Sequence, residues 1–247
     1  MTSKRPAALT GSYVLLGVLV VLALLGPSLA PRLFADATTG ARFLAGARGT
    51  VVAATLVMAF ATGIGLLTGA LAALGSPFVD TLLSRAVEIA GALPSLIVVV
   101  VLRAAAPALG LVAIGAVLAV LRTLGNAKTV RASVLDLSRE DFALAARALG
   151  SGRFRLFRTH VLPHVVGHVL SNAAFTAAAV VALDAALSFC GLGGHGDTWG
   201  SLLADAAHAR SAGGVIVPTL GVLAIVAPLQ VIAEHLSARV SAGRRFV

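Results

Sequence analysis

The sequence predicts an all-α, polytopic membrane protein with six transmembrane helices. Hydrophobic residues make up 58% of the 247 residues and charged residues only 12%, whereas a soluble domain carries about 25% charged residues. The apolar residues gather in stretches long enough to cross a bilayer, for which a helix needs about 20 residues. The basic residues gather between these stretches, as they do on the cytoplasmic side of membrane proteins.

The apolar stretches define the expected elements in chain order. A tail of residues 1–10 precedes a first span at 11–30, and an outer segment of residues 31–48 leads into a transmembrane domain at 49–235. A second tail covers residues 236–247. Two of the spans exceed one bilayer crossing, which predicts tilt or projection beyond the membrane. Within the transmembrane domain we expect spans at about 49–74, 80–104, 108–127, 164–190 and 213–235.

The first span has a second interpretation as a secretory signal peptide. Lys4 and Arg5 would form its basic start, and Ser28-Leu29-Ala30 would form its cleavage site. We favour a retained helix, because cleavage would leave five spans and place the two termini on opposite sides of the membrane.

The distribution of basic residues predicts the orientation. Residues 122–158 hold eight Lys and Arg residues, which places the loop 128–163 and both termini in the cytoplasm. The formal net charge of +9 also fits a nucleic-acid-binding protein. Aromatic residues for base stacking are limited to Phe154 and Phe157 in this basic region, so we expect no nucleic-acid partner.

The loop 128–163 is predicted to hold two short helices joined by a glycine turn at Gly150. The first helix has a face at i, i+3, i+4 and i+7 whose small alanines allow it to lie deep in a cleft of another protein. The alternative is an ordinary surface helix pair that is basic because it is cytoplasmic. The residues expected at the protein interface are Phe142, Ala145, Ala146, Leu149, Gly150, Phe154, Leu162 and Pro163.

The spacing in this loop resembles the coupling loop of binding-protein-dependent ABC importer permeases. Those proteins carry Glu-Ala-Ala, three residues, Gly, nine residues and Ile-x-Leu-Pro. This chain has Leu144-Ala145-Ala146, then Gly150, then His160-Val161-Leu162-Pro163, so the spacing is kept while the Glu and the Ile are replaced.

Within that family the chain most resembles the second permease subunit of peptide and nickel importers, the DppC/OppC/NikC type, from about residue 36 to 240. The segment that begins at Asp184 and ends at Gly193 is similar to that group's Glu-Ala-x-Leu-Ser-Phe-Leu-Gly-Leu-Gly, and Trp199 follows as in the group. Residues 36–48 depart from its pattern. The group's Asp, Arg, Asp and Pro of the third span correspond to Asp80, Arg85, Glu88 and Pro94.

The resemblance implies a type I ABC importer permease fold and a subunit that is not an enzyme. The implied function is ATP-driven import of peptides or a related small solute, with nickel or a metal chelate as another cargo. The implied partners are a homologous permease subunit, two cytoplasmic ATPase subunits, an extracellular or periplasmic substrate-binding protein and the lipid of a bacterial inner membrane. ATP and Mg are expected on the ATPase, and no cofactor is expected in this chain.

Ionisable groups within apolar spans face a helix bundle or a cavity, so they are candidates for a structural or a pathway role. Arg85 and Glu88 are three residues apart and can neutralise each other, which favours the structural role. His160, His164 and His168 have the spacing of metal ligands, but Pro163 interrupts their face, and we expect no metal site. The candidates are Arg85, Glu88, Pro94, Asp184 and Trp199.

Other classes of function remain open from the sequence. A secondary transporter or a channel would use an ion gradient and need no ATPase. A membrane-embedded enzyme would need a catalytic group, and the chain contains no phosphate-binding Gly-x-x-x-x-Gly-Lys loop, Gly-x-Ser-x-Gly turn or His-Glu-x-x-His motif. We therefore expect no catalytic residues and no ATP hydrolysis by this chain.

Overall fold

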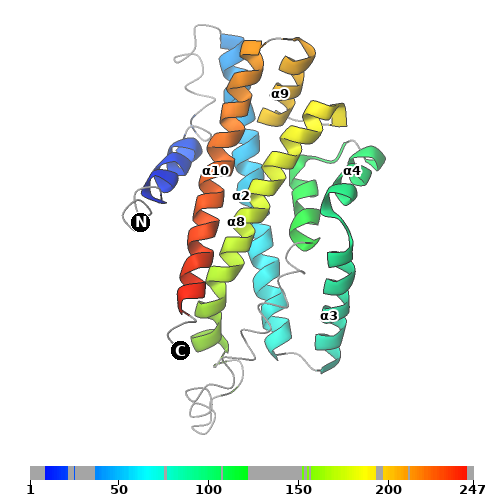
Figure 1. Ribbon diagram of the computed structural model, residues 1–247, viewed down its shortest axis with the longest axis vertical. Helices are drawn as coiled ribbons and strands as arrows, with labels where there is room; N and C mark the ends of the chain where they lie inside the picture. The colour runs from blue at the N-terminus through cyan, green and yellow to red at the C-terminus, as the bar shows by residue number, and fades with distance from the viewer. Residues whose placement is uncertain are drawn as a thin grey trace.

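The computed structural model is helical throughout the ordered elements that it describes. Three long helices lie side by side, and shorter helices flank them (Figure 1). The all-α prediction is confirmed for this part of the chain. The described residues are 9–21, 25, 37–74, 77–106, 108–121, 152, 155, 157–192, 197–210 and 212–243.

The three long helices are α2 (Ala37–Leu74), α8 (Leu162–Leu187) and α10 (Ala212–Gly243). Each carries a stretch that is long and apolar enough to cross a membrane. These stretches are Gly40–Thr68 in α2, Val165–Leu192, which continues past the end of α8, and Gly214–Ala238 in α10. The second, fifth and sixth predicted spans are therefore found as long apolar helices.

Shorter apolar helices cover the remaining predicted spans in part. A helix at Leu9–Val21 overlaps the first half of the first predicted span, and another at Leu111–Leu121 lies within the fourth. Residues 22–24, 26–30 and 122–127 of these two spans lie outside the described residues. The described helices include three that meet the length and hydropathy of a span, so the count of six stays a prediction.

The third predicted span, at 80–104, is not one helix. The chain forms α3 (Pro77–Ala92) and α4 (Ser95–Ala105), with a break at Leu93-Pro94. Pro94 lies in an extended conformation (φ −63°, ψ 112°) just before α4. Proline has no N–H for a helical hydrogen bond and disfavours helix at the residue before it, which accounts for the break.

The described part of the expected outer segment 31–48 is helical. Helix α2 already begins at Ala37 and runs without interruption into the predicted second span. Leu44 and Ala47 are buried in this extension. Because the extension packs against α9 (Trp199–His208), it is stabilised by a tertiary contact that hydropathy does not report.

Small residues hold the long helices close together. Ala173, Ala174, Ala177 and Ala178 on α8 are fully buried, and small side chains allow helix backbones to approach each other. The hydroxyl of Ser171 on α8 donates to the backbone oxygen of Ala233 on α10 at 2.6 Å. The contact surface of α8 therefore combines close packing with an interhelical hydrogen bond.

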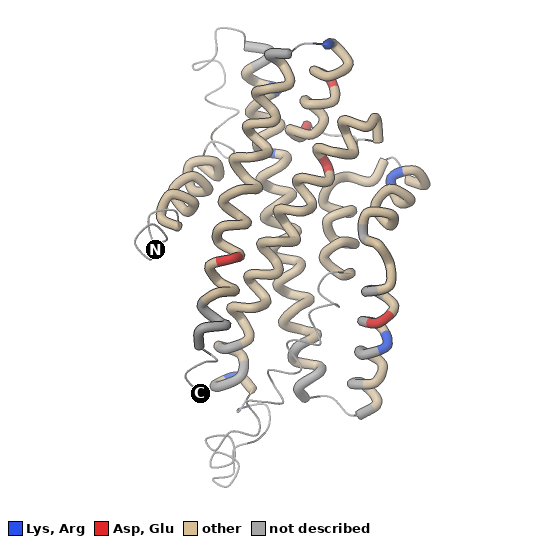
Figure 2. The backbone as a smooth tube through the Cα atoms, viewed as in Figure 1, with Lys and Arg blue, Asp and Glu red and all other residues tan. Residues whose placement is uncertain are grey.

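A second apolar cluster joins α4 and the helix at Leu111–Leu121 to α2 and α8. Large apolar side chains on α2, α3, α4 and α10 point away from the bundle and are exposed. Few charged residues lie along the described helices, as Figure 2 shows. The second cluster consists of Ala53, Val57, Val99, Leu111, Ile114, Leu118, Val180 and Leu187.

The two ends of the bundle differ. At one end, which we call the α9 end, α9 packs beside the last turn of α8 and the first part of α2 (Figure 1). At the other end, which we call the η1 end, a π-helical turn η1 (Phe157–Val161) leads into α8. A second turn, η2 (Ser188–Leu192), follows α8 at the α9 end and departs from helical geometry at Gly191 (φ 78°).

Candidate functional site

A buried ion pair lies at the α9 end between Arg103, in the last turn of α4, and Asp184, in the last turn of α8. Arg103 Nη2 lies 3.2 Å from Asp184 Oδ1, and the two side chains are only 2% and 6% exposed. Arg103 Nη1 also donates to the backbone oxygen of Leu109 at 2.5 Å. Arg103 thereby joins α8 to the turn between α4 and the helix at Leu111–Leu121.

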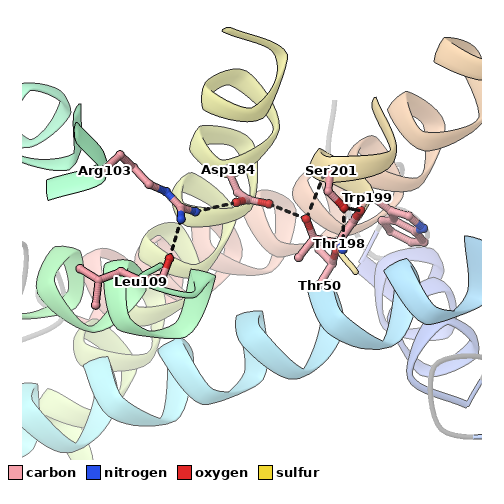
Figure 3. Close-up of polar contacts among 7 residues, drawn as sticks. All are labelled: Thr50, Arg103, Leu109, Asp184, Thr198, Trp199 and Ser201. Carbon is pink, nitrogen blue, oxygen red and sulfur yellow. Dashed lines mark hydrogen bonds and ion pairs between the residues drawn. The ribbon is translucent and has the colours of Figure 1, made fainter. Parts of the chain in front are cut away.

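The second oxygen of Asp184 binds the start of α9. Thr198 Oγ1 donates to Asp184 Oδ2 at 2.9 Å and accepts from the backbone N–H of Ser201 at 3.2 Å. Ser201 Oγ accepts from the backbone N–H of Thr198 at 3.1 Å, which completes a capping box. One carboxylate therefore connects α4 with the N-terminal cap of α9 (Figure 3).

Trp199 attaches the same end of α9 to α2. Its side chain is almost completely buried, and its indole N–H donates to the backbone oxygen of Phe43 at 3.1 Å. Its backbone N–H donates to Thr50 Oγ1 at 3.1 Å, and its ring stacks on Phe43 with centroids 5.4 Å apart. We call the connected residues the Asp184 cluster, which comprises Thr50, Arg103, Leu109, Asp184, Thr198, Trp199 and Ser201.

Glycines make the close approach around this cluster possible. A Cβ atom at Gly200 would lie 2.6 Å from Asp184 Oδ2, and one at Gly49 would lie 2.0 Å from the backbone oxygen of Asp197. Any side chain at these positions would push α9 away from α8 or α2. The Asp184 cluster therefore depends on glycine on two sides.

An exposed ion pair adds to the attachment of α9. Arg42 on α2 and Asp205 on α9 are paired, and both side chains are more than half exposed. Exposed pairs contribute about 0–1 kcal/mol to stability, so the buried contacts dominate the position of α9.

Arg85 and Glu88 lie on the exposed surface of α3. Arg85 Nη1 is 2.8 Å from Glu88 Oε2, and the side chains are 73% and 48% exposed. The two charges neutralise each other within one helix turn, whereas Asp184 pairs with a residue of another helix. The structure therefore separates the candidates into an exposed pair on α3 and the buried Asp184 cluster, with Pro94 at the break between α3 and α4.

The predicted coupling loop lies mostly outside the described residues, and this includes Phe142, Ala145, Ala146, Leu149, Gly150 and Phe154. The end of the loop is described. Leu162 is half-buried and packs beside a small apolar cluster, and Pro163 is exposed in the first turn of α8.

Phe157 lies in the predicted loop 128–163, in the part that follows Gly150 and was expected to form the second short helix. It is buried in η1 and packs with Val165 and Val169 of α8, with Leu66 and Ala70 of α2 beside them. Phe157, Val165 and Val169 are separated by eight and four residues, multiples of four that predict a shared helical face. The cluster that they form joins the end of the loop to two long helices.

Arg103 and Thr198 were not among the sequence candidates. Two opposite charges in apolar spans would have predicted an Arg103–Asp184 pair, because such charges pair within a bundle. For Thr198, the Thr-x-x-Ser spacing indicates the capping role. Its hydrogen bond to Asp184 is a tertiary contact that no local pattern predicts.

Residues 63–242 match a family described as the binding-protein-dependent transport system inner membrane component. The match begins within α2 and runs through α10, and it includes all of the Asp184 cluster except Thr50. The chain belongs to this family. Together with the long apolar helices, this membership identifies a multi-pass membrane protein that is a permease component of a transport system.

Individual relatives are permease proteins as well. The chain is 33% identical over 165 residues to a putative peptide permease protein of Brucella ovis, which covers 66% of this chain and 54% of that protein. It is 28% identical over 213 residues to the dipeptide transport system permease protein DppC of Bacillus subtilis, covering 77% and 66%. It is 29% identical over 144 residues to the oligopeptide transport system permease protein OppC of the same organism, covering 58% and 47%.

These matches confirm the resemblance to permeases of the DppC/OppC type. The aligned regions span from about half to two thirds of the relatives' own length.

Proposed function

We propose that this chain is one permease subunit of an ATP-driven, binding-protein-dependent importer for peptides or a related small solute. The observation that carries the proposal is the family match over residues 63–242, which includes the whole predicted coupling loop. The peptide cargo is favoured because the matched relatives are described as peptide, dipeptide and oligopeptide permeases. Nickel or a metal chelate has no comparable support among them.

The proposed transporter contains further subunits. A homologous permease would form the other half of the path, two ATPase subunits would bind ATP and Mg on the cytoplasmic side, and a binding protein would deliver cargo on the other side. In this arrangement the η1 end and both termini are cytoplasmic, and the α9 end faces outward, as the basic loop indicates. The chain itself would hold no cofactor.

Alternating access would couple ATP to transport. Closure of the ATPases would move the loop 128–163, and the two permeases would open toward the α9 end to accept cargo. The described end of the loop supports this route, because Phe157 belongs to the apolar cluster of α8 against which Leu66 and Ala70 of α2 pack. A displacement of the loop would therefore reach two of the long helices directly.

A matched pair of loop substitutions tests the docking face. Ala146→Glu places a charge on the predicted docking face, and Leu144→Glu places the same charge about 150° around the helix from the centre of that face. We expect Ala146→Glu to abolish ATP-dependent uptake while the inserted protein level stays normal, because an unpaired charge in an apolar groove costs several kcal/mol. Leu144→Glu should retain uptake.

Equal uptake by the two variants would contradict ATPase docking through this face. Uptake by the chain alone, driven by a proton or sodium gradient without ATP, would instead identify a secondary transporter.

A further inference from the structure

We propose that Asp184 is a positioning residue for transport, which makes α9 move as one body with α4 and α8 by joining Arg103 to the cap of α9. The inference rests on the proposed transport function. It names the residues that couple the helices at the α9 end, a role that neither the family match nor the relatives' names give to any residue.

The geometry gives each oxygen of Asp184 a separate partner. Oδ1 pairs with Arg103 of α4, and Oδ2 accepts from Thr198 at the start of α9 (Figure 3). The carboxylate itself belongs to the last turn of α8. Hydrogen bonds are directional, so this chain of contacts fixes the mutual orientation of three helices.

Apolar packing alone would already hold α4 against α8. Val99 of α4 is completely buried in a cluster with Val180 and Leu187 of α8. Replacing a buried ion pair by apolar residues of similar size is often neutral or stabilising, so a buried pair is weak evidence for a gain in stability. Apolar surfaces can slide past one another, whereas the Arg103–Asp184 pair specifies one register.

Loss of the Thr198 hydroxyl interrupts this connection at Asp184, and it also removes the cap bond that this hydroxyl accepts from the backbone N–H of Ser201. The other polar contacts of the first turn of α9 go to α2, through Thr50 and the backbone of Phe43. The Arg103–Asp184 pair stays in place, and the remaining polar contacts from the first turn of α9 to another helix, within the part of the chain that the structure describes, go to α2. A rigid connection between α4, α8 and α9 would become a loose one.

The test uses Thr198→Val, which keeps the shape and removes the hydroxyl, and Thr198→Ser as the matched control, which keeps the hydroxyl. Both are made in the full transporter with Cys190→Ala, because Cys190 is an exposed free cysteine. Uptake and ATP hydrolysis are measured in liposomes. Spin labels on Ala105→Cys of α4 and Ala209→Cys after α9, both at exposed positions, report the distance between the two elements.

We expect Thr198→Val to lower the uptake rate by about tenfold while ATP hydrolysis continues, since a hydrogen bond to a charged group contributes roughly one to two powers of ten to an equilibrium constant. The distribution of label distances should broaden in Thr198→Val and stay narrow in Thr198→Ser. An assembled Thr198→Val transporter with wild-type uptake and a narrow distribution would overturn the proposal.

A second variant covers the case in which Thr198→Val does not assemble. The double replacement Arg103→Met with Asp184→Leu removes both charges and is expected to insert normally. Normal assembly with at least about tenfold slower uptake and a broad distribution of label distances supports the positioning role. The expected size is the same as for Thr198→Val, because this variant also loses the hydrogen bond between Thr198 and the Asp184 carboxylate. Wild-type uptake by the double variant contradicts it, and so does failure of both variants to assemble, which would show that the contacts serve folding.

Failure of the wild-type transporter to take up peptides with ATP is a different result. It would reject the proposed function, whereas the results above concern the role of Asp184 within it.

Discussion

Gly221 of α10 lies against the face of the Trp199 ring, so closely that a Cβ atom at Gly221 would fall 2.7 Å from Trp199 Cδ2. Trp199 in turn is bound by Phe43 and Thr50 of α2. The ring therefore fills the space between α2, α9 and α10, and it can do so because position 221 has no side chain.

Gly221→Ala should destabilise the protein by about 1–3 kcal/mol, because the added methyl group forces Trp199 out of its position. Thermal unfolding of the purified protein in detergent measures the effect. Gly63→Ala is the matched control, since a Cβ atom at Gly63 meets nothing within 4 Å. Equal melting temperatures for the two variants would show that the Trp199 ring can shift without cost.

Arg103→Met should destabilise the protein by about 3–5 kcal/mol, because it leaves the Asp184 carboxylate buried without its cation. Arg85→Met, which breaks the exposed pair on α3, should cost about 0–1 kcal/mol. The further change Asp184→Leu in the Arg103→Met background should restore most of the lost stability. No recovery in the double variant would mean that Asp184 is well satisfied without Arg103.

Phe157→Ala should release the end of the predicted coupling loop from α2 and α8. The substitution removes a buried ring and should cost about 3 kcal/mol of local stability. Hydrogen exchange at Phe157–Val161 should become faster, and Arg158→Ala, at an exposed position of the same turn, should leave it unchanged. Unchanged exchange in Phe157→Ala would show that η1 is held by other contacts.

The orientation can be measured with introduced cysteines in a Cys190→Ala background. Ser151→Cys should react only with reagent on the cytoplasmic side, and Ser211→Cys only with reagent on the outside, because the basic residues of 122–158 stay in the cytoplasm. Labelling of Ser151→Cys from the outside would invert the topology and remove the basis for ATPase docking.

The long helices α2, α8 and α10 were predictable because hydropathy over 20 or more residues is a property of the sequence itself. The break at Pro94 was not, although the proline is visible. Helix α10 continues through Pro218 and Pro228, and helices within membranes tolerate proline when neighbouring groups compensate for the lost hydrogen bond. Whether a proline interrupts a helix therefore depends on its surroundings.

The Asp184 cluster was predictable only in part. Asp184 and Trp199 stood out as residues of unusual type for their positions, whereas Arg103 lies 81 residues from Asp184 along the chain. No local periodicity connects two such positions. The start of α2 at Ala37 was unpredictable for the same reason, because it depends on contacts between residues far apart in the sequence. Gly46 and Gly49 of this part of α2 pack against the start of α9 and the residues just before it.

ATP-driven peptide import is tested most directly by uptake of labelled peptides into liposomes that contain this chain with its partner permease, ATPase and binding protein. We expect uptake that requires ATP on the side of the membrane that holds the ATPase subunits, stops when the ATPase loses its catalytic carboxylate, and persists when proton and sodium gradients are collapsed. Uptake by this chain alone, without ATP and abolished by collapse of an ion gradient, would contradict it.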